Sequence, residues 1–186
     1  IVHYHLNPGG VTRIIGSQVA GIHRVSEDIP VTLLCGSDPG PANFQGAVII
    51  TNSMLDYWDA SWPDFSERVE AITKILKHHL TDHAVLHCHN PNLGKNPALT
   101  LALHRLAGEG NPVVNHCHDF PEDRPANMEI LNNFIARSTG KSLPDILYPG
   151  FPKYHFVILN SCDYHRILRS GIPDSRIHLL PNPVSL

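Results

Sequence analysis

The chain has 186 residues, of which 42% are hydrophobic and 17% are charged, and its formal net charge is −3. This length suffices for one well-packed domain but is short for two, and the composition argues against a disordered segment or a coiled coil. Lysine and arginine are not in excess, as they are in proteins that bind a phosphate backbone, which argues against nucleic acid as a partner.

The sequence shows no membrane-spanning or secretory segment. No apolar run approaches the ~20 residues of a membrane span, and the first residues lack a basic region that leads into an apolar one. The four cysteines are far apart and form no C-x-x-C pair, which indicates reduced thiols of an intracellular core rather than disulfides or zinc ligands. We therefore expect a soluble, cytoplasmic protein with no membrane span. Because the chain opens on Ile1 inside a strand pattern, we also expect further residues ahead of it.

The first element is a strand, a glycine turn and a helix. Residues 1–6 are strand-like, Asn7-Pro8-Gly9-Gly10 break the strand, and residues 11–24 have a helical pattern. Glycines at this point let the backbone approach a ligand closely, and the free N–H groups and positive dipole end of the helix favour a phosphate. Gly9 and Gly10 are therefore a candidate anion-binding loop. The alternative is that they only allow the helix to pack against a sheet.

Further along the chain, short apolar runs alternate with helical patterns, which predicts a parallel sheet with crossover helices. The runs are almost continuously apolar, as expected when helices cover both faces of the sheet. The remaining expected strands are 31–35, 47–51, 84–89, 112–116, 155–160 and 176–180. The remaining expected helices are 64–80, 97–107 and 162–170.

The least regular stretch covers residues 120–152. Its prolines, in Glu122-Asp123-Arg124-Pro125 and Leu143-Pro144-Asp145, bracket a short helix expected near 128–137. We expect a shaped insertion on the ligand side of the sheet, and the alternative is a surface excursion without function.

Polar residues follow several of the expected strands. In an open parallel sheet, ligands bind beyond the carboxyl ends of the strands, so these positions are candidate site residues. They are Asn7-Pro8-Gly9-Gly10, His87-Cys88-His89-Asn90, His116-Cys117-His118-Asp119 and Asn160-Ser161. In each H-x-H motif both imidazoles point to one face of the strand, and the two pairs are expected to converge at one crevice.

Three interpretations of the paired histidines stay open. His87, His89, His116 and His118, with Asp119, have the ligand types of a zinc or iron site, as in a metal-dependent hydrolase. Neutral imidazoles also suit proton transfer or hydrogen bonding to a polyhydroxylated ligand. In the third interpretation His87 and His116 are satisfied core residues and only His89 and His118 reach solvent, which we favour for the first member of each pair.

The end of the chain carries the most specific motif. The helix over 162–170 is stopped by Gly171-Ile172-Pro173, and the strand over 176–180 leads into Pro181-Asn182-Pro183-Val184. This resembles the glycosyltransferase group 1 family, retaining enzymes of GT-B fold in which such a segment joins two Rossmann-like domains. The opening H-x-N-P-G-G-V-x-R, the H-x-H at 87–89 and the H-x-H-D-F at 116–120 resemble motifs of that family in the same order.

The resemblance implies a fold and a set of site residues. The fold is α/β, with a Rossmann-like doubly wound parallel sheet that is one half of a GT-B fold, and residues 1–186 form its N-terminal, acceptor-side domain. The site would comprise a donor phosphate loop, an acceptor cleft and a catalytic histidine beside the reacting sugar. These are Gly9, Gly10 and Arg13 for the loop, His89, Asn90 and Asp119 for the cleft, and His118 for catalysis.

One departure from the family concerns the nucleotide-sugar. The family holds it mostly with a second domain that contains an E-x-x-x-x-x-x-x-E segment, and this chain has no such segment. Groups that stabilise the leaving diphosphate are therefore missing. We expect the C-terminal nucleotide-sugar domain in the same protein beyond Leu186, and no turnover by residues 1–186 alone.

For the intact enzyme, the resemblance implies transfer of a sugar from a nucleotide-sugar to an acceptor hydroxyl with retention, without a required cofactor or metal. The acceptor is unknown. Besides the metal-dependent hydrolase, a non-catalytic module that binds a sugar or nucleotide remains an alternative.

Overall fold

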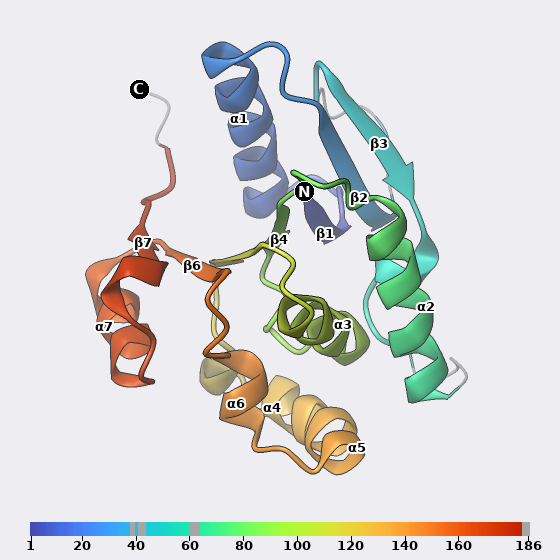
Figure 1. The fold of residues 1–186 in the computed structure, drawn as a ribbon, viewed down its shortest axis with the longest axis vertical. Helices are drawn as coiled ribbons and strands as arrows, with labels where there is room; N and C mark the ends of the chain where they lie inside the picture. Colours follow the sequence, from blue (N-terminus) through green and yellow to red (C-terminus); the bar gives the residue numbers. More distant parts are fainter. Residues whose placement is uncertain (38–39, 41–43, 60–63, 184–186) are drawn as a thin grey trace.

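The computed structural model describes residues 1–37, 40, 44–59 and 64–183. In this part of the chain seven strands form one all-parallel sheet, in the order β3-β2-β1-β4-β5-β6-β7 (Figure 1). The strands are β1 (Val2–His5), β2 (Val31–Ser37), β3 (Ala47–Thr51), β4 (Leu86–His89), β5 (Val113–Cys117), β6 (Tyr154–Ile158) and β7 (Ile177–Leu179). They confirm the predicted Rossmann-like α/β fold. Val184, the last residue of the P-N-P-V motif, lies outside the described residues.

The order of the strands changes direction beside β1. β2 and β3 follow on one side of β1 and β4 to β7 on the other, and Val2 of β1 pairs with both Leu34 and Cys88. Such a change of direction opens a crevice at the carboxyl ends of the flanking strands, because their connections leave toward opposite faces of the sheet. The crevice expected for a ligand therefore lies beyond the ends of β1 and β4.

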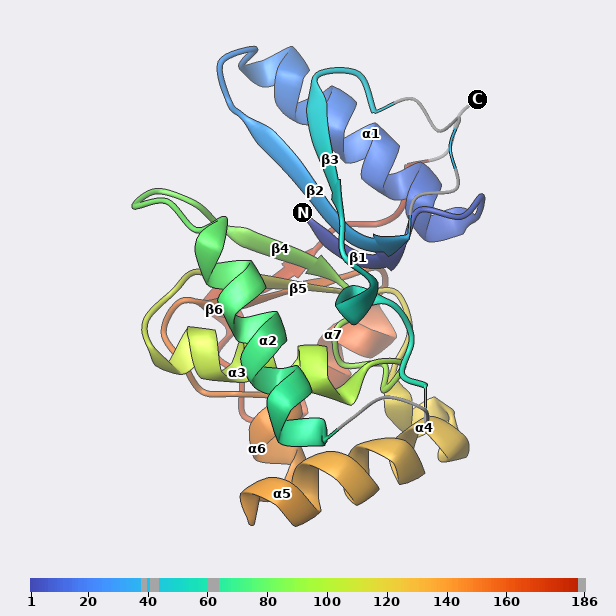
Figure 2. The same ribbon diagram turned by 90° about the vertical axis from the view of Figure 1, so that its right-hand side faces the viewer.

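Helices cover both faces of the sheet, as the continuous apolar strands predict. One face carries α1 (Gly10–Val25), and the other carries α2 (Phe65–His78), α3 (Pro97–Gly108) and α7 (Ser161–Arg169) (Figure 2). Successive residues of β2 show the division, since Leu33 packs in the cluster under α1 and Leu34 packs in the larger cluster with α2 and α3. The strands therefore separate two hydrophobic cores.

Side-chain caps fix the starts of α2, α3 and α7. Asp64 accepts hydrogen bonds from the backbone N–H groups of Ser66 and Glu67 at the start of α2. Asn96 and Asn160 cap α3 and α7 in the same way. These helices and α1 confirm the four long helices predicted from the sequence. No helix in the described residues is both long and apolar enough to cross a membrane.

The irregular stretch after β5 forms a further helical layer. It contains α4 (Pro125–Leu131), a π-helical turn (Asn132–Ala136), α5 (Arg137–Thr139) and α6 (Leu143–Leu147), which lie outside α3 (Figures 1 and 2). Leu131, Ile135 and Ile146 are fully buried in the core cluster that includes α3. The apolar side chains of this segment therefore cover α3, and its placement on the ligand side of the sheet stays a prediction.

Candidate functional site

The parallel register of β4 and β5 places the two H-x-H motifs side by side. His89 of β4 lies opposite His116 of β5 in the ladder, and side chains two residues apart point to the same face. His87, His89, His116 and His118 therefore share the face of the sheet that α1 covers, and we call them the histidine cluster. The two motifs converge as predicted.

Hydrogen bonds and ring stacking hold the histidine cluster together. His89 Nδ1 lies 2.9 Å from His118 Nε2, and His87 Nε2 lies 3.2 Å from His116 Nδ1. The rings of His116 and His118 stack with centroids 4.5 Å apart. Gln18 of α1 bridges the two strands, because its Oε1 lies 3.0 Å from His89 Nε2 and its Nε2 lies 3.0 Å from His116 Nδ1. The cluster and α1 therefore form one connected network.

Only part of the histidine cluster reaches solvent. His89 and His116 are each 1% exposed, whereas His87 and His118 are half-buried. His116 is buried and His118 reaches solvent as expected, although the Nε2 of His116 has no hydrogen-bond partner in the described residues. The expectation that His87 is buried and His89 reaches solvent is wrong. The cause is the placement of α1, since Gln18 contacts His89 at the carboxyl end of β4, whereas Val85 at the other end of the strand is left exposed.

Burial keeps the histidine cluster neutral. Desolvation lowers the pKa of His87 to about 4 and that of His116 to about 3, and it lowers the pKa of His89 well below its ordinary value. Desolvation also lowers the pKa of His118, against a smaller opposing effect of Asp119. At pH 7 each ring therefore has one N–H donor and one unprotonated nitrogen, the state suited to hydrogen bonds with hydroxyl groups.

The arrangement of the rings bears on the metal interpretation. Nitrogen atoms of His87, His89 and His116 lie within 4.8 Å of one another, which is the spacing of possible metal ligands. However, the planes of His87 and His89 are only 7° from parallel, with centroids 5.0 Å apart. Because the lone pair of an imidazole nitrogen lies in the ring plane, parallel rings do not direct their lone pairs to the centre of a tetrahedron. The geometry favours a hydrogen-bonded stack.

Asp119 lies outside this group of possible ligands. Its carboxylate is exposed and accepts a hydrogen bond from Arg124 at 2.8 Å. The two residues form an exposed ion pair beside the histidine cluster, at the start of the stretch that leads to α4.

Asn90 connects β1, β4 and the segment that leaves β5. Its Oδ1 accepts hydrogen bonds from the backbone N–H of His118 at 2.6 Å and of Asp119 at 3.1 Å. Its carbonyl accepts a hydrogen bond from the Tyr4 hydroxyl at 2.7 Å. Its φ of 53° is in the left-handed region, which asparagine tolerates better than most residues. The side chain is therefore engaged by the protein itself, and it holds the backbone of His118 in place.

The loop before α1 is open to solvent. Gly9 is in an extended conformation, and a Cβ added to Gly10 would meet no atom within 4 Å. Neither backbone strain nor packing therefore requires these glycines, which disfavours the packing alternative. No side chain caps α1, in contrast to α2, α3 and α7, and the first turn of α1 holds no acidic residue. The positive end of α1 thus faces an open hollow of about 690 Å³ that Gly9, Gly10 and Arg13 line.

The structure groups the candidate residues in two neighbouring places. His89, Asn90, His118 and Asp119 contact one another in a chain of hydrogen bonds. Gly9, Gly10 and Arg13 line the hollow along α1, and neither His89 nor His118 lines it.

Gln18 of α1 contacts His89 and His116 and was missed in the sequence. A signal for it exists, since Gln18 is the polar residue in the apolar helical stripe of Val11, Ile14, Ile15, Val19 and Ile22.

The sequence matches one known family along almost its whole length. The family model of Glycosyltransferase Family 4 matches residues 8–186. The chain belongs to this family. It is also 30% identical, over 195 residues, to mannosylglucosyl-3-phosphoglycerate synthase of Petrotoga mobilis, an alignment that covers 99% of the chain and 36% of that protein. The chain thus spans little more than a third of the length of this curated relative, and the family 4 match supports the resemblance inferred from the motifs.

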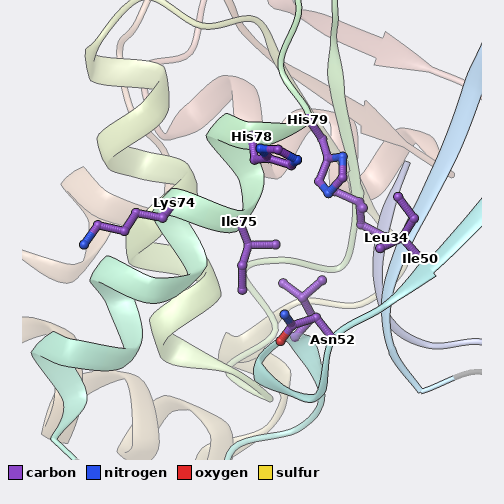
Figure 3. Close-up of a pocket in the computed structure, with 8 residues that line it drawn as sticks. Leu34, Ile50, Asn52, Lys74, Ile75, His78 and His79 are labelled. Atoms are coloured by element: carbon purple, nitrogen blue, oxygen red, sulfur yellow. The ribbon is translucent and has the colours of Figure 1, made fainter.

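Another hollow, of about 360 Å³, lies on the opposite face of the sheet from the histidine cluster. Leu34 and Ile50 line it from β2 and β3, and Lys74, Ile75 and His79 line it from the α2 side (Figure 3). None of the strand-end candidates of the family 4 motifs lines this hollow. Leu34, Ile50, Leu55 and Ile75 give it an apolar wall, and Asn52, Lys74, His78 and His79 add polar groups.

We predict that replacing Asn90 by alanine lowers the free energy of unfolding by about 2–4 kcal/mol. The substitution removes two hydrogen bonds to backbone N–H groups and leaves a β-carbon in the left-handed region without a compensating amide. Asn90→Gly should cost less, because glycine adopts this conformation without strain. Urea unfolding of the variants measures the difference, and a larger loss for glycine than for alanine would contradict the role of the backbone conformation.

We predict that the chain loses stability as the pH falls from about 6.5, the ordinary histidine pKa. The folded chain protonates His116 only near its lowered pKa of about 3 and His3 near a pKa of about 4. Between these values the unfolded chain binds more protons, so the free energy of unfolding falls by up to about 1.4 kcal/mol per pH unit for each such histidine. Urea unfolding between pH 7 and pH 4.5 measures the slope. The His116→Gln variant should have a shallower slope, and an unchanged slope would count against the neutral cluster.

Proposed function

We propose that residues 1–186 are the N-terminal, acceptor-side domain of a retaining glycosyltransferase with two Rossmann-like domains. The whole protein would transfer a sugar from a nucleotide-sugar to a hydroxyl group of an acceptor. Membership of family 4 supports the reaction class. The length of the Petrotoga mobilis relative, of which the chain spans 36%, supports a further domain in cis for the nucleotide-sugar.

The observation that carries the proposal is the pairing of two features at one edge of the sheet. The open N-terminus of α1, with Gly9 and Gly10, follows β1, and His118 follows β5 across the change of strand direction. A phosphate suits the first feature because N–H groups and the helix dipole attract anions. A sugar hydroxyl suits the second because a neutral imidazole both donates and accepts hydrogen bonds.

In this proposal each candidate residue has a distinct task. Gly9 and Gly10 leave room for the diphosphate to approach the backbone, and the exposed Arg13 adds positive charge in the same hollow. His118 is the catalytic residue that contacts the reacting sugar. His89 and Asn90 position it, and Asp119 lines the acceptor cleft together with Arg124.

The proposed reaction requires no cofactor or metal from this domain. Negative charge that develops on the leaving diphosphate would be stabilised by the N-terminus of α1 and by groups of the second domain. The nucleotide-sugar is a substrate, so the two substrates and the second domain are the partners of this chain.

The name of the Petrotoga mobilis relative guides the choice of an acceptor to test. Its name denotes the synthesis of mannosylglucosyl-3-phosphoglycerate. We propose that an anionic glycoside of this kind, glucosyl-3-phosphoglycerate, is the first acceptor to assay, with nucleotide-activated mannose and glucose as donors. The anomeric configuration of the new bond, determined by NMR, tests retention.

His118→Ala in the protein that carries this chain should lower kcat/KM for transfer on the order of 100-fold. The reason is the loss of a positioned hydrogen-bonding group at the reacting sugar. His155→Ala is the matched control, because His155 belongs to β6 and contacts His178 rather than the histidine cluster. An unchanged kcat/KM in the His118 variant would refute the assignment of this residue.

Residues 1–186 alone should show no sugar transfer in a product assay with the same donors and acceptors. The groups that activate the leaving diphosphate are proposed to lie in the second domain, and a domain without them lacks the main electrostatic contribution to the rate. Addition of the second domain as a separate chain should restore product formation. Turnover by residues 1–186 alone would refute the division of labour between the domains.

A further inference from the structure

We propose that Gln18 is a positioning residue that sets the tautomer of His118 through His89. The consequence is that the Nδ1 of His118 is unprotonated. The inference about the tautomer rests on the contacts of this chain. The use of that nitrogen for a substrate hydroxyl rests on the proposed function.

The first step is the amide of Gln18. Its Oε1 can only accept a hydrogen bond, and it lies 3.0 Å from His89 Nε2. His89 Nε2 must therefore carry the proton and donate. On the other side, the amide Nε2 can only donate, and it lies 3.0 Å from His116 Nδ1, so this orientation of the amide leaves His116 Nδ1 unprotonated. The proton of His116 is then on Nε2, which is buried and has no hydrogen-bond partner in the described residues.

The second step passes from His89 to His118. A neutral imidazole carries one proton, so His89 with a proton on Nε2 has a lone pair on Nδ1. That lone pair lies 2.9 Å from His118 Nε2, which must donate to it. Burial lowers the pKa of both rings, which is consistent with neutral imidazoles at pH 7.

The third step concerns the remaining nitrogen of His118. With the proton on Nε2, its Nδ1 is unprotonated, and in the described part of the chain no protein group donates a hydrogen bond to it. His118 is half-buried, so this acceptor is available to a ligand. A substrate hydroxyl that meets this nitrogen would donate its own proton to it, and a substrate carbonyl would find no donor there.

The orientation of the Gln18 amide therefore determines both tautomers. If the amide were turned, its NH₂ group would donate to His89 Nε2, and the protons of His89 and His118 would both move to Nδ1, because each neutral ring carries one proton. Gln18 of α1 therefore determines, through His89 of β4, whether the Nδ1 of His118 carries a proton. The same helix carries the proposed phosphate loop eight residues earlier, about 12 Å along its axis.

The test is a long-range ¹H–¹⁵N correlation spectrum of the 186-residue chain with ¹⁵N-labelled histidine rings at pH 7. We expect protonated Nε2 and unprotonated Nδ1 for both His89 and His118, and an unprotonated Nδ1 for His116. A protonated Nδ1 on His118 in the unsubstituted chain would overturn the inference.

Variants of Gln18 test its control of these protons. In Gln18→Glu both side-chain oxygens accept, so His89 and His118 should keep their tautomers while the proton of His116 moves from Nε2 to Nδ1. In Gln18→Leu the signals of His89 and His118 should become those of a mixture of tautomers. Gln45→Leu is the matched control, because Gln45 is exposed and outside the cluster, and its spectrum should be unchanged. Unchanged tautomers in both Gln18 variants would overturn the role of this residue.

These readouts do not depend on catalysis. If the tautomers are as expected but His118→Ala transfers sugar normally, the proposed function fails while the role of Gln18 stands. If transfer depends on His118 but its Nδ1 carries a proton, the role of Gln18 fails while the proposed function stands.

Discussion

The structure depends on the register between β4 and β5, which sets His89 opposite His116 beneath α1. This pairing forces four imidazoles into a space from which water is largely excluded. Charged rings would repel one another there and lose their hydration, so the rings stay neutral. They hydrogen-bond to one another and to Gln18, and the buried Nε2 of His116 has no partner in the described residues. α1 contacts this stack through Gln18, and Asn90 accepts a hydrogen bond from the backbone N–H of His118.

The neutral cluster and the open helix end give the carboxyl edge of the sheet two different chemistries. The first turn of α1 has backbone N–H groups that no side chain caps and the positive end of the helix dipole. Gly9 and Gly10 leave the space beside these groups free of side chains. His118 offers hydrogen bonds without charge, which suits a sugar better than a phosphate. A nucleotide-sugar has both parts. The start of α1 and His118 both lie at the carboxyl edge of the sheet, on the two sides of the change of strand direction between β1 and β4.

The sequence predicts the elements that depend on local pattern and misses those that depend on tertiary packing. The apolar runs, the helical patterns and the glycines before α1 are local signals, and the corresponding elements are found. The burial of His89 and the exposure of His87 depend on where α1 crosses the sheet, which no local pattern encodes. Gln18 has meaning only when its helix faces β4. Likewise, the stretch after β5 reads as polar loop around one short helix, although its scattered apolar residues complete the core outside α3. The roles of the site residues still rest on resemblance and geometry.

The most direct test of the proposed site is a crystal structure of the whole protein with a nucleotide-sugar bound. We predict that the diphosphate lies against the backbone N–H groups of Gly10, Val11 and Thr12, and that a hydroxyl group of the sugar donates a hydrogen bond to His118 Nδ1. A nucleotide-sugar bound with its phosphates away from the start of α1, or with its sugar out of reach of His118, would contradict it.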